Sequence, residues 1–124
     1  LVTLRVTGAR DDNDAQLAAR AIARSMLVKT SWHGLDPNWG RIMAAVGYSG
    51  AAAEEEKTRI SYGDVAAFDR GRVADAAARE RLRDVMRRRE FEVAVDLGLG
   101  SGACVLLTCD LSGEYVRINA EYTT

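Results

Sequence analysis

The sequence predicts an α+β fold, with a mostly antiparallel sheet of about five strands and helices packed on one face. Two observations carry this prediction. Segments in which every second residue is apolar indicate strands, and segments with apolar residues at helical spacing indicate helices. They follow the order strand, two helices, two strands, helix, two strands and a short last helix. Strands that are neighbours in sequence favour hairpins, and hence an antiparallel sheet.

The chain opens with a strand and a helix. Residues 1–8 alternate apolar side chains with threonine and arginine, which predicts a half-buried strand. From about residue 14 to residue 26 the apolar side chains take helical spacing, so these residues are expected to form the first helix. Residues 27–35 are expected to form a short extended piece that ends in a loop at Gly34.

The run Asp-Pro-Asn-Trp-Gly-Arg at residues 36–41 predicts the start of the second helix. Asp36 is expected to be the N-cap and Pro37 the first helical residue, because proline tolerates the first turn, where no backbone donor is needed. Gly47 is expected to stop this helix. Residues 49–56 then read as a surface connection of small residues and glutamates.

Three polar residues are left unexplained by this helix start. Asn38 and Arg41 lie in its first turns and Lys29 lies shortly upstream, all with hydrogen-bond donors to spare. A helix N-terminus together with these cations could hold a carboxylate. A structural role in fixing the loop is an equally good interpretation, and the residues alone leave both open.

The second half of the chain is expected to contain four strands, one long helix and a short terminal helix. A tight turn at Gly63 and Asp64 joins the first two of these strands. Tyr115 and Ile118 have helical spacing, which predicts the terminal helix. The expected strands are residues 58–62, 65–69, 90–97 and 103–109, and the expected long helix is residues 73–89.

An arginine-rich stretch within the long helix has two interpretations. It could bind RNA or phosphate, but acidic residues lie at pairing distance and no aromatic residues are interleaved to stack on bases. We therefore predict a solvated helix face. The arginines are Arg79, Arg81, Arg83, Arg87, Arg88 and Arg89.

A glycine cluster follows the strand at residues 90–97. Gly98, Gly100 and Gly102 superficially suggest a phosphate-binding loop, but such a loop needs a following helix, and the next residues are typical of a strand. We predict a hairpin turn at these glycines.

Composition excludes several function classes. The chain has 124 residues, with 17 Lys+Arg balanced by 18 Asp+Glu, so no nucleic-acid partner is expected. Its apolar runs are far shorter than the ~18 residues that span a bilayer, and no signal peptide is visible, so we expect a cytoplasmic protein with no membrane partner. The chain fits a single domain at residues 1–124, and its start at Leu1, without methionine, suggests a piece of a longer protein.

Cysteine and histidine content argues against metal and disulfide chemistry. Cys104 and Cys109 fall on opposite faces of one expected strand, so they cannot easily bridge, and the chain reads as reduced. His33 is the only histidine, which excludes a His-rich metal site and leaves no metal or cofactor predicted. A lone histidine in a loop is more often structural than catalytic.

Several runs together resemble the ornithine acetyltransferases, a family also called glutamate N-acetyltransferases. The resemblance covers essentially the whole chain in order. Its motifs are Val6-Thr7-Gly8-Ala9, Val28-Lys29-Thr30, the run 36–41, Ala44-Ala45-Val46-Gly47-Tyr48, Asp96-Leu97-Gly98, Cys109-Asp110-Leu111-Ser112 and residues 115–122.

The resemblance implies an acyltransferase of arginine biosynthesis. Family members cut themselves before a threonine, which then takes acetyl from N-acetylornithine, releases ornithine and passes the acetyl group to L-glutamate. Some members also accept acetyl-CoA. The two chains assemble as a heteromer, commonly two alpha and two beta chains, and no cofactor is implied.

The same resemblance implies where this chain belongs. No residue here matches the nucleophile, so the chain is similar to the C-terminal domain of the beta chain, without a catalytic residue of its own. The substrate-contacting asparagine and final threonine of the family match Asn119 and Thr124. A tail such as residues 119–124 usually frays, so the resemblance reverses that expectation. A role for Lys29, Asn38 and Arg41 as pocket or loop support stays open.

Two other classes of function remain open from the sequence. The chain could be a stand-alone module that binds a small molecule such as an amino acid, without catalysis. It could also be a purely structural assembly domain, in which case the tail would lie far from any pocket.

Overall fold

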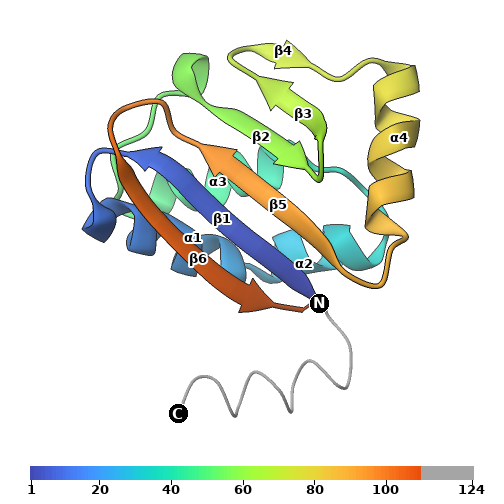
Figure 1. Ribbon diagram of the computed structural model, residues 1–124, viewed down its shortest axis with the longest axis horizontal. Coiled ribbons are helices and arrows are strands. Elements are labelled where there is room, and N and C mark those ends of the chain that lie inside the picture. The colour runs from blue at the N-terminus through green and yellow to red at the C-terminus, as the bar shows by residue number, and fades with distance from the viewer. Residues whose placement is uncertain (110–124) are drawn as a thin grey trace.

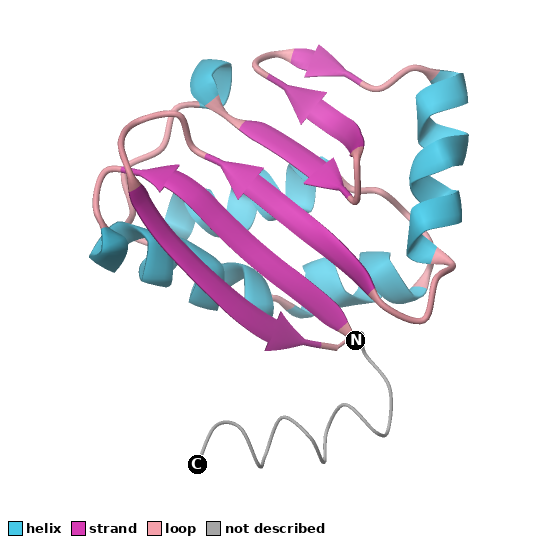
Figure 2. Cartoon of the chain, viewed as in Figure 1, coloured by secondary structure: helices cyan, strands magenta, loops and turns pink. Residues whose placement is uncertain are grey.

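A six-stranded sheet runs through residues 1–109, the part of the chain that the computed structural model describes (Figures 1 and 2). The strand order is β4-β3-β2-β5-β1-β6. Neighbouring strands are antiparallel except β1 and β5, which are parallel. This confirms the predicted mixed fold with a mostly antiparallel sheet. The strands are β1 (Val2–Ala9), β2 (Arg59–Tyr62), β3 (Val65–Asp69), β4 (Arg72–Val73), β5 (Phe91–Asp96) and β6 (Gly102–Thr108).

The helices bury the apolar face of this sheet. In Figure 1, α1, α2 and α3 lie behind the central strands, and α4 stands at the end near β3. Alternate residues of β1 point into this layer, where Val2, Leu4 and Val6 are buried, so the predicted period of two is confirmed. The helices are α1 (Asp12–Arg24), α2 (Met26–His33), α3 (Trp39–Tyr48) and α4 (Ala76–Met86), and Glu55–Lys57 form a short 3-10 helix.

Helix α2 is the largest correction to the predicted elements, because residues 27–35 were expected to be extended and then looped. Its N-cap is Ser25, whose hydroxyl accepts a hydrogen bond from the Val28 backbone N–H at 3.2 Å. Tertiary packing decides its conformation, since the helix buries Val28 and Trp32 in the core. Beta-branched and aromatic residues therefore misled the local prediction.

Helix α3 begins two residues later than predicted. Asn38, and not Asp36, is the N-cap, and its side-chain oxygen accepts a hydrogen bond from the Arg41 backbone N–H at 3.1 Å. Pro37 therefore precedes the helix and is not its first residue. Gly47 lies inside the helix, which continues to Tyr48.

Helix α4 is shorter than the predicted helix at residues 73–89. Its N-cap is Asp75, whose carboxylate accepts from the Ala78 backbone N–H at 2.8 Å. Residues 72–73 instead pair with β3 as the short strand β4, which adds a sixth strand to the predicted five. The hairpin of β2 and β3 about Gly63 and Asp64 is confirmed.

The predicted hairpin turn at the glycine cluster is wrong. β5 and β6 do not pair with each other, because both pair with β1, which lies between them. The glycine loop (residues 97–102) instead crosses the end of β1. A Cβ on Gly102 would lie 2.1 Å from the Asp11 carbonyl oxygen, and one on Gly100 would lie 2.8 Å from the Ala9 carbonyl oxygen. Glycine is therefore required here by close backbone packing.

Other predicted features have simple outcomes. Cys104 lies in β6 and Cys109 just after it, and both are free thiols. In residues 1–109, His, Cys, Asp and Glu side chains form no group that could hold a metal ion, and every helix is too short or too polar to cross a membrane. The predicted terminal helix and tail lie outside the described residues.

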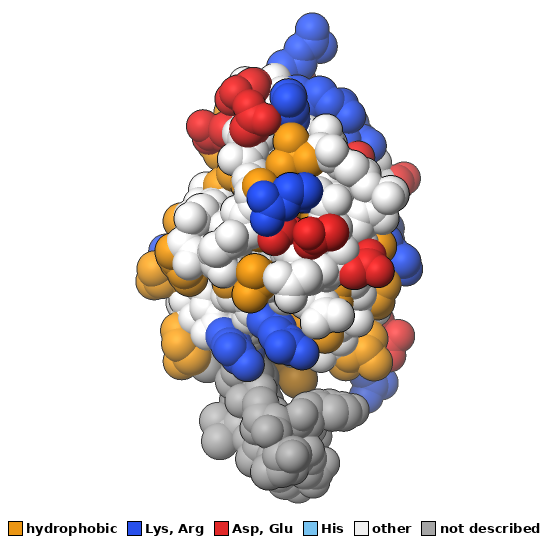
Figure 3. Space-filling model, turned by 90° about the vertical axis from the view of Figure 1, so that its left-hand side faces the viewer, with side chains coloured by type: hydrophobic (Ala, Val, Ile, Leu, Met, Phe, Trp, Pro, Cys, Tyr) orange, Lys and Arg blue, Asp and Glu red, His pale blue; other side chains and the backbone are white. Residues whose placement is uncertain are grey.

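Charges are interspersed on the surface. The side of the molecule in Figure 3 shows basic, acidic and apolar side chains mixed with one another. This distribution matches the near-neutral net charge of the whole chain, −1 at pH 7.

Candidate functional site

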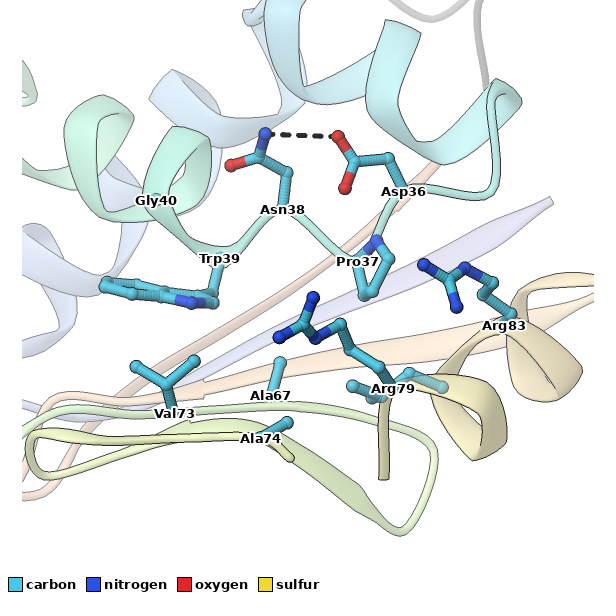
Figure 4. Close-up of a pocket in the computed structure, with 11 residues that line it drawn as sticks. Asp36, Pro37, Asn38, Trp39, Gly40, Ala67, Val73, Ala74, Arg79 and Arg83 are labelled. Carbon is cyan, nitrogen blue, oxygen red and sulfur yellow. Dashed lines mark hydrogen bonds between the residues drawn. The ribbon is translucent and has the colours of Figure 1, made fainter. Parts of the chain in front are cut away.

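A cavity of about 390 Å³ lies between the first turn of α3, strands β3 and β4, and helix α4 (Figure 4). This volume falls within the range of small-molecule pockets. Its apolar walls come from Pro37, Trp39, Ala67, Val73, Ala74 and Leu82. Its polar lining comes from Asp36, Asn38, the backbone of Gly40, Arg79 and Arg83.

Hydrogen bonds within the loop before α3 hold one wall of the cavity. The Asp36 backbone N–H donates to the Ser31 carbonyl at 2.8 Å, which fixes the loop to the end of α2. The Asn38 side-chain amide donates to the Asp36 carboxylate at 3.2 Å, the bond drawn in Figure 4. Because the Asn38 oxygen also caps α3, both ends of this amide serve the wall itself. Asn38 is thus hydrogen-bonded within the wall through both its amide nitrogen and its amide oxygen.

Arg41 and Lys29 lie away from the cavity. The Arg41 guanidinium donates from Nη1 to the Leu27 carbonyl at 2.8 Å, so it ties the start of α3 to α2. Lys29 is buried within α2, with 1% of its surface exposed. The structure brings Asn38 to the cavity but not the two cations that the sequence placed beside it. A direct substrate contact by Lys29 or Arg41 stays a prediction.

Trp39 is held firmly at the cavity wall. Its ring stacks on Phe68 with the centroids 4.2 Å apart and the planes 14° from parallel. A second cavity of about 310 Å³ shares Trp39 and Val73 and is also lined by Glu55 and Glu56. Trp39 thus lines both a cavity with arginines in its wall and a cavity with glutamates in its wall.

Sequence reasoning missed Arg79 and Arg83 as cavity residues. It predicted a solvated arginine face, which holds for Arg87, whose guanidinium pairs with Asp84 and Glu80. It also holds for Arg79, which is exposed, while Arg83 is half-buried, yet both side chains also project toward Pro37 across the cavity (Figure 4). The signal that could have found them is their spacing around Leu82, which is fully buried. Residues at i, i+3 and i+4 share a helix face, so these arginines had to flank the core.

Two buried polar groups lie in the core beside α2. The Trp32 indole nitrogen and the Tyr62 hydroxyl are both enclosed and accept or donate no hydrogen bond of good geometry within the described residues. Burial raises the pKa of Tyr62 well above its ordinary value; the nearby Trp32 N–H opposes this shift and the negative charge of Asp36 adds to it. Tyr62 is therefore neutral at physiological pH.

The two residues with the most specific predicted role cannot be placed. Asn119 and Thr124 lie outside the described residues, so their contact with substrate stays a prediction. His33 closes α2 as its last residue.

The fold and the cavity define a class of protein: a mixed α/β domain with a cavity between its helices and one end of its sheet. A family model described as the ArgJ family matches residues 1–124. The chain belongs to this family, which confirms the resemblance found in the sequence.

Two curated relatives illustrate the match. The arginine biosynthesis bifunctional protein ArgJ of Geobacter sulfurreducens is 50% identical over 123 residues, which cover 99% of this chain and 31% of that protein. The glutamate N-acetyltransferase of Methanosarcina mazei is 43% identical over 128 residues, which cover 100% of this chain and 32% of that protein. The chain thus spans about a third of the length of the curated relatives it matches.

A solved structure supports the fold independently. The crystal structure of the arginine biosynthesis bifunctional protein ArgJ from Bacillus halodurans superposes with a TM-score of 0.82 at 36% identity. The match covers 98% of this chain and 57% of that chain. The mixed α/β architecture is therefore shared with a solved family member.

Proposed function

We propose that this chain is part of an acyltransferase of arginine biosynthesis, which transfers acetyl from N-acetylornithine to L-glutamate. The observation that carries the proposal is the family match over all of residues 1–124. Relatives named as arginine biosynthesis proteins and glutamate N-acetyltransferases, at 50% and 43% identity, support the same activity. The chain would work in the cytoplasm as the C-terminal domain of the beta chain, beside an alpha chain, in a self-cleaved heteromer with two of each.

The chemistry of this proposal needs a nucleophile outside the present chain. A threonine hydroxyl attacks the acetyl carbonyl of N-acetylornithine, and its proton passes through a neighbouring amine to the ornithine nitrogen as that bond breaks. The amine of glutamate then attacks the acetyl-threonine ester and regenerates the hydroxyl. Fixed hydrogen-bond donors stabilise the oxyanion in both steps.

This chain would supply the substrate pocket. An asparagine amide offers a donor and an acceptor, and a threonine adds a hydroxyl, which together suit an amino acid with a carboxylate and an acylated amine. Asn119 and Thr124 would make these contacts, while Asn38 and Arg41 hold the loop before α3 in place. The competing interpretation, a module that binds an amino acid without catalysis, predicts binding but no transfer.

The test uses the intact protein that carries this chain. Asn119→Ala, and separately deletion of Thr123 and Thr124, should lower kcat/KM for transfer from N-acetylornithine to glutamate at least tenfold, since one lost hydrogen bond to substrate costs about 1.4 kcal/mol or more. Asn13→Ala, which removes an exposed asparagine of α1, is the matched control and should change nothing. Thermal unfolding should be the same for all variants.

Two outcomes would contradict parts of this proposal. If kcat/KM is unchanged in both tail variants, Asn119 and Thr124 are not substrate contacts. If the intact protein transfers no acetyl group to glutamate from either N-acetylornithine or acetyl-CoA, the activity itself is wrong. Comparing the two donors also separates a bifunctional enzyme from one limited to exchange between ornithine and glutamate.

A further inference from the structure

We propose that the cavity between α3 and α4 binds a small organic anion, whose carboxylate or phosphate group pairs with Arg79 and Arg83. The proposal concerns binding and does not depend on acetyl transfer. The sequence suggested a carboxylate at the N-terminus of this helix, held by Lys29 and Arg41. In the structure the N-terminus of this helix does line the cavity, but the cations beside it are Arg79 and Arg83, which belong to α4 on the opposite wall.

The residues that line the cavity carry a net positive charge. Arg79 makes no side-chain hydrogen bond or ion pair with any residue in 1–109, and Arg83 makes a single exposed pair with Glu80 at 3.3 Å, which contributes little. Asp36 is the acidic residue in the lining, and its carboxylate is turned toward Asn38 (Figure 4). The two guanidiniums are therefore available to an anion from outside.

Helix α3 adds to the same electrostatic preference. Its first turn faces the cavity, and that turn contains no acidic residue to balance the positive end of the helix dipole. Arg79 and Arg83 approach from α4 across the space (Figure 4). A guanidinium presents forked donors that match the two oxygens of a carboxylate or phosphate. Both walls of the cavity therefore favour a ligand with one of these anionic groups.

The rest of the cavity calls for an apolar body on the anion. Pro37, Trp39 and Leu82 form apolar walls, and the Trp39 ring is packed from behind by its stacking on Phe68. Val73 at the rim is 55% exposed, an apolar side chain left without cover by the described residues. A volume of about 390 Å³ has room for a ring system or a branched chain beside the anionic group.

The test is isothermal titration calorimetry on the intact protein with three probes of one shape. 1-Naphthoate and 1-naphthyl phosphate carry the two anionic groups, and 1-naphthalenemethanol is neutral. At least one anion should bind with a Kd below about 1 mM, and the neutral probe at least tenfold more weakly. The tighter of the two anions tells a carboxylate site from a phosphate site.

Variants locate the binding. Arg79→Gln with Arg83→Gln should weaken the anionic probe at least tenfold. Arg81→Gln with Arg89→Gln removes the same charge from the same stretch outside the cavity and should leave the Kd within twofold. Arg79→Gln alone breaks no side-chain hydrogen bond or ion pair within the described residues, so it is the control for misfolding of the double variant, and it should weaken binding at least threefold.

Three results would overturn the inference: no binding of either anion at millimolar concentration, equal binding of the neutral probe, or equal weakening by the control pair. Because the readout is binding, loss of acetyl transfer in any variant neither supports nor contradicts it.

Discussion

The glycine loop and the run 36–41 are both conspicuous in the sequence, yet the structure uses them in opposite ways. In the glycine loop the backbone fills all available space, since a single added Cβ on Gly102 would lie 2.1 Å from the Asp11 carbonyl. In the run 36–41, internal hydrogen bonds hold Asn38 and Trp39 around open space. Unusual residues therefore indicate a binding site only where the folded chain leaves room for a ligand.

The glycine loop gives the largest expected effect. Gly102→Ala should lower the free energy of unfolding by about 3 kcal/mol, because the new Cβ meets backbone that cannot move aside. Urea unfolding followed by circular dichroism measures this change. Gly47→Ala is the matched control: it lies in α3 with nothing within 4 Å of the added atom, and should stabilise by up to about 1 kcal/mol.

A loss below about 1 kcal/mol for Gly102→Ala would mean that the backbone near Gly102 moves to accommodate the added Cβ. The close backbone packing would then not be what requires glycine at this position.

Alkaline pH tests the core around Tyr62. Up to about pH 10 tyrosine is neutral in both states, so Tyr62 adds no pH dependence. At higher pH the unfolded chain ionises while the buried hydroxyl keeps its proton, so the free energy of unfolding falls by up to about 1.4 kcal/mol per pH unit. Tyr62→Phe should remove this slope, as urea unfolding between pH 9 and 11 would measure.

The same variant has a second expected property. At pH 7, Tyr62→Phe should change stability by less than about 0.5 kcal/mol, because the hydroxyl has no well-formed hydrogen bond in the described residues to lose. A loss above about 1.5 kcal/mol would show that this hydroxyl has a partner, and that the core here is better satisfied than its geometry suggests.

The cap of α3 gives a smaller expected loss of stability than the glycine loop. Asn38→Ala should destabilise by about 1 kcal/mol, since it removes the acceptor for the Arg41 N–H and the bond to Asp36. Asn38→Ser keeps a capping oxygen and brings no second negative charge beside Asp36, so it should lose less than half as much. Thermal unfolding of the three proteins ranks them, and equal losses for Ala and Ser would contradict the capping role.

Strands were predictable because burial on one face imposes a strict period. β1 and β5 appear within a residue or two of their predicted bounds, since a one-residue slip would turn every apolar side chain outward. The order of the strands in the sheet was not predictable, because no local sequence pattern indicates that β1 lies between β5 and β6. The hairpin predicted at Gly98 failed for that reason.

The cavity was half predictable. Its α3 wall was visible in the run 36–41, because proline and capping residues act locally. Its α4 wall was not, because Arg79 and Arg83 were interpreted by the acidic residues near them in sequence. Only the packing of α4 against β3 turns them toward Pro37.

The position of β1 has a kinetic consequence. This strand pairs on both sides with segments from the other end of the described chain: Val2 lies opposite Phe91 and Thr108. During synthesis one edge of β1 stays unpaired until β5 has left the ribosome, and the other edge stays unpaired until β6 has followed. Contacts between segments so far apart slow folding, because a long loop must close before they form. We therefore expect the pairing of β1 with β5 and β6 to be a late step of folding. Until that step, the unpaired backbone edges of β1 are open to pairing with other chains.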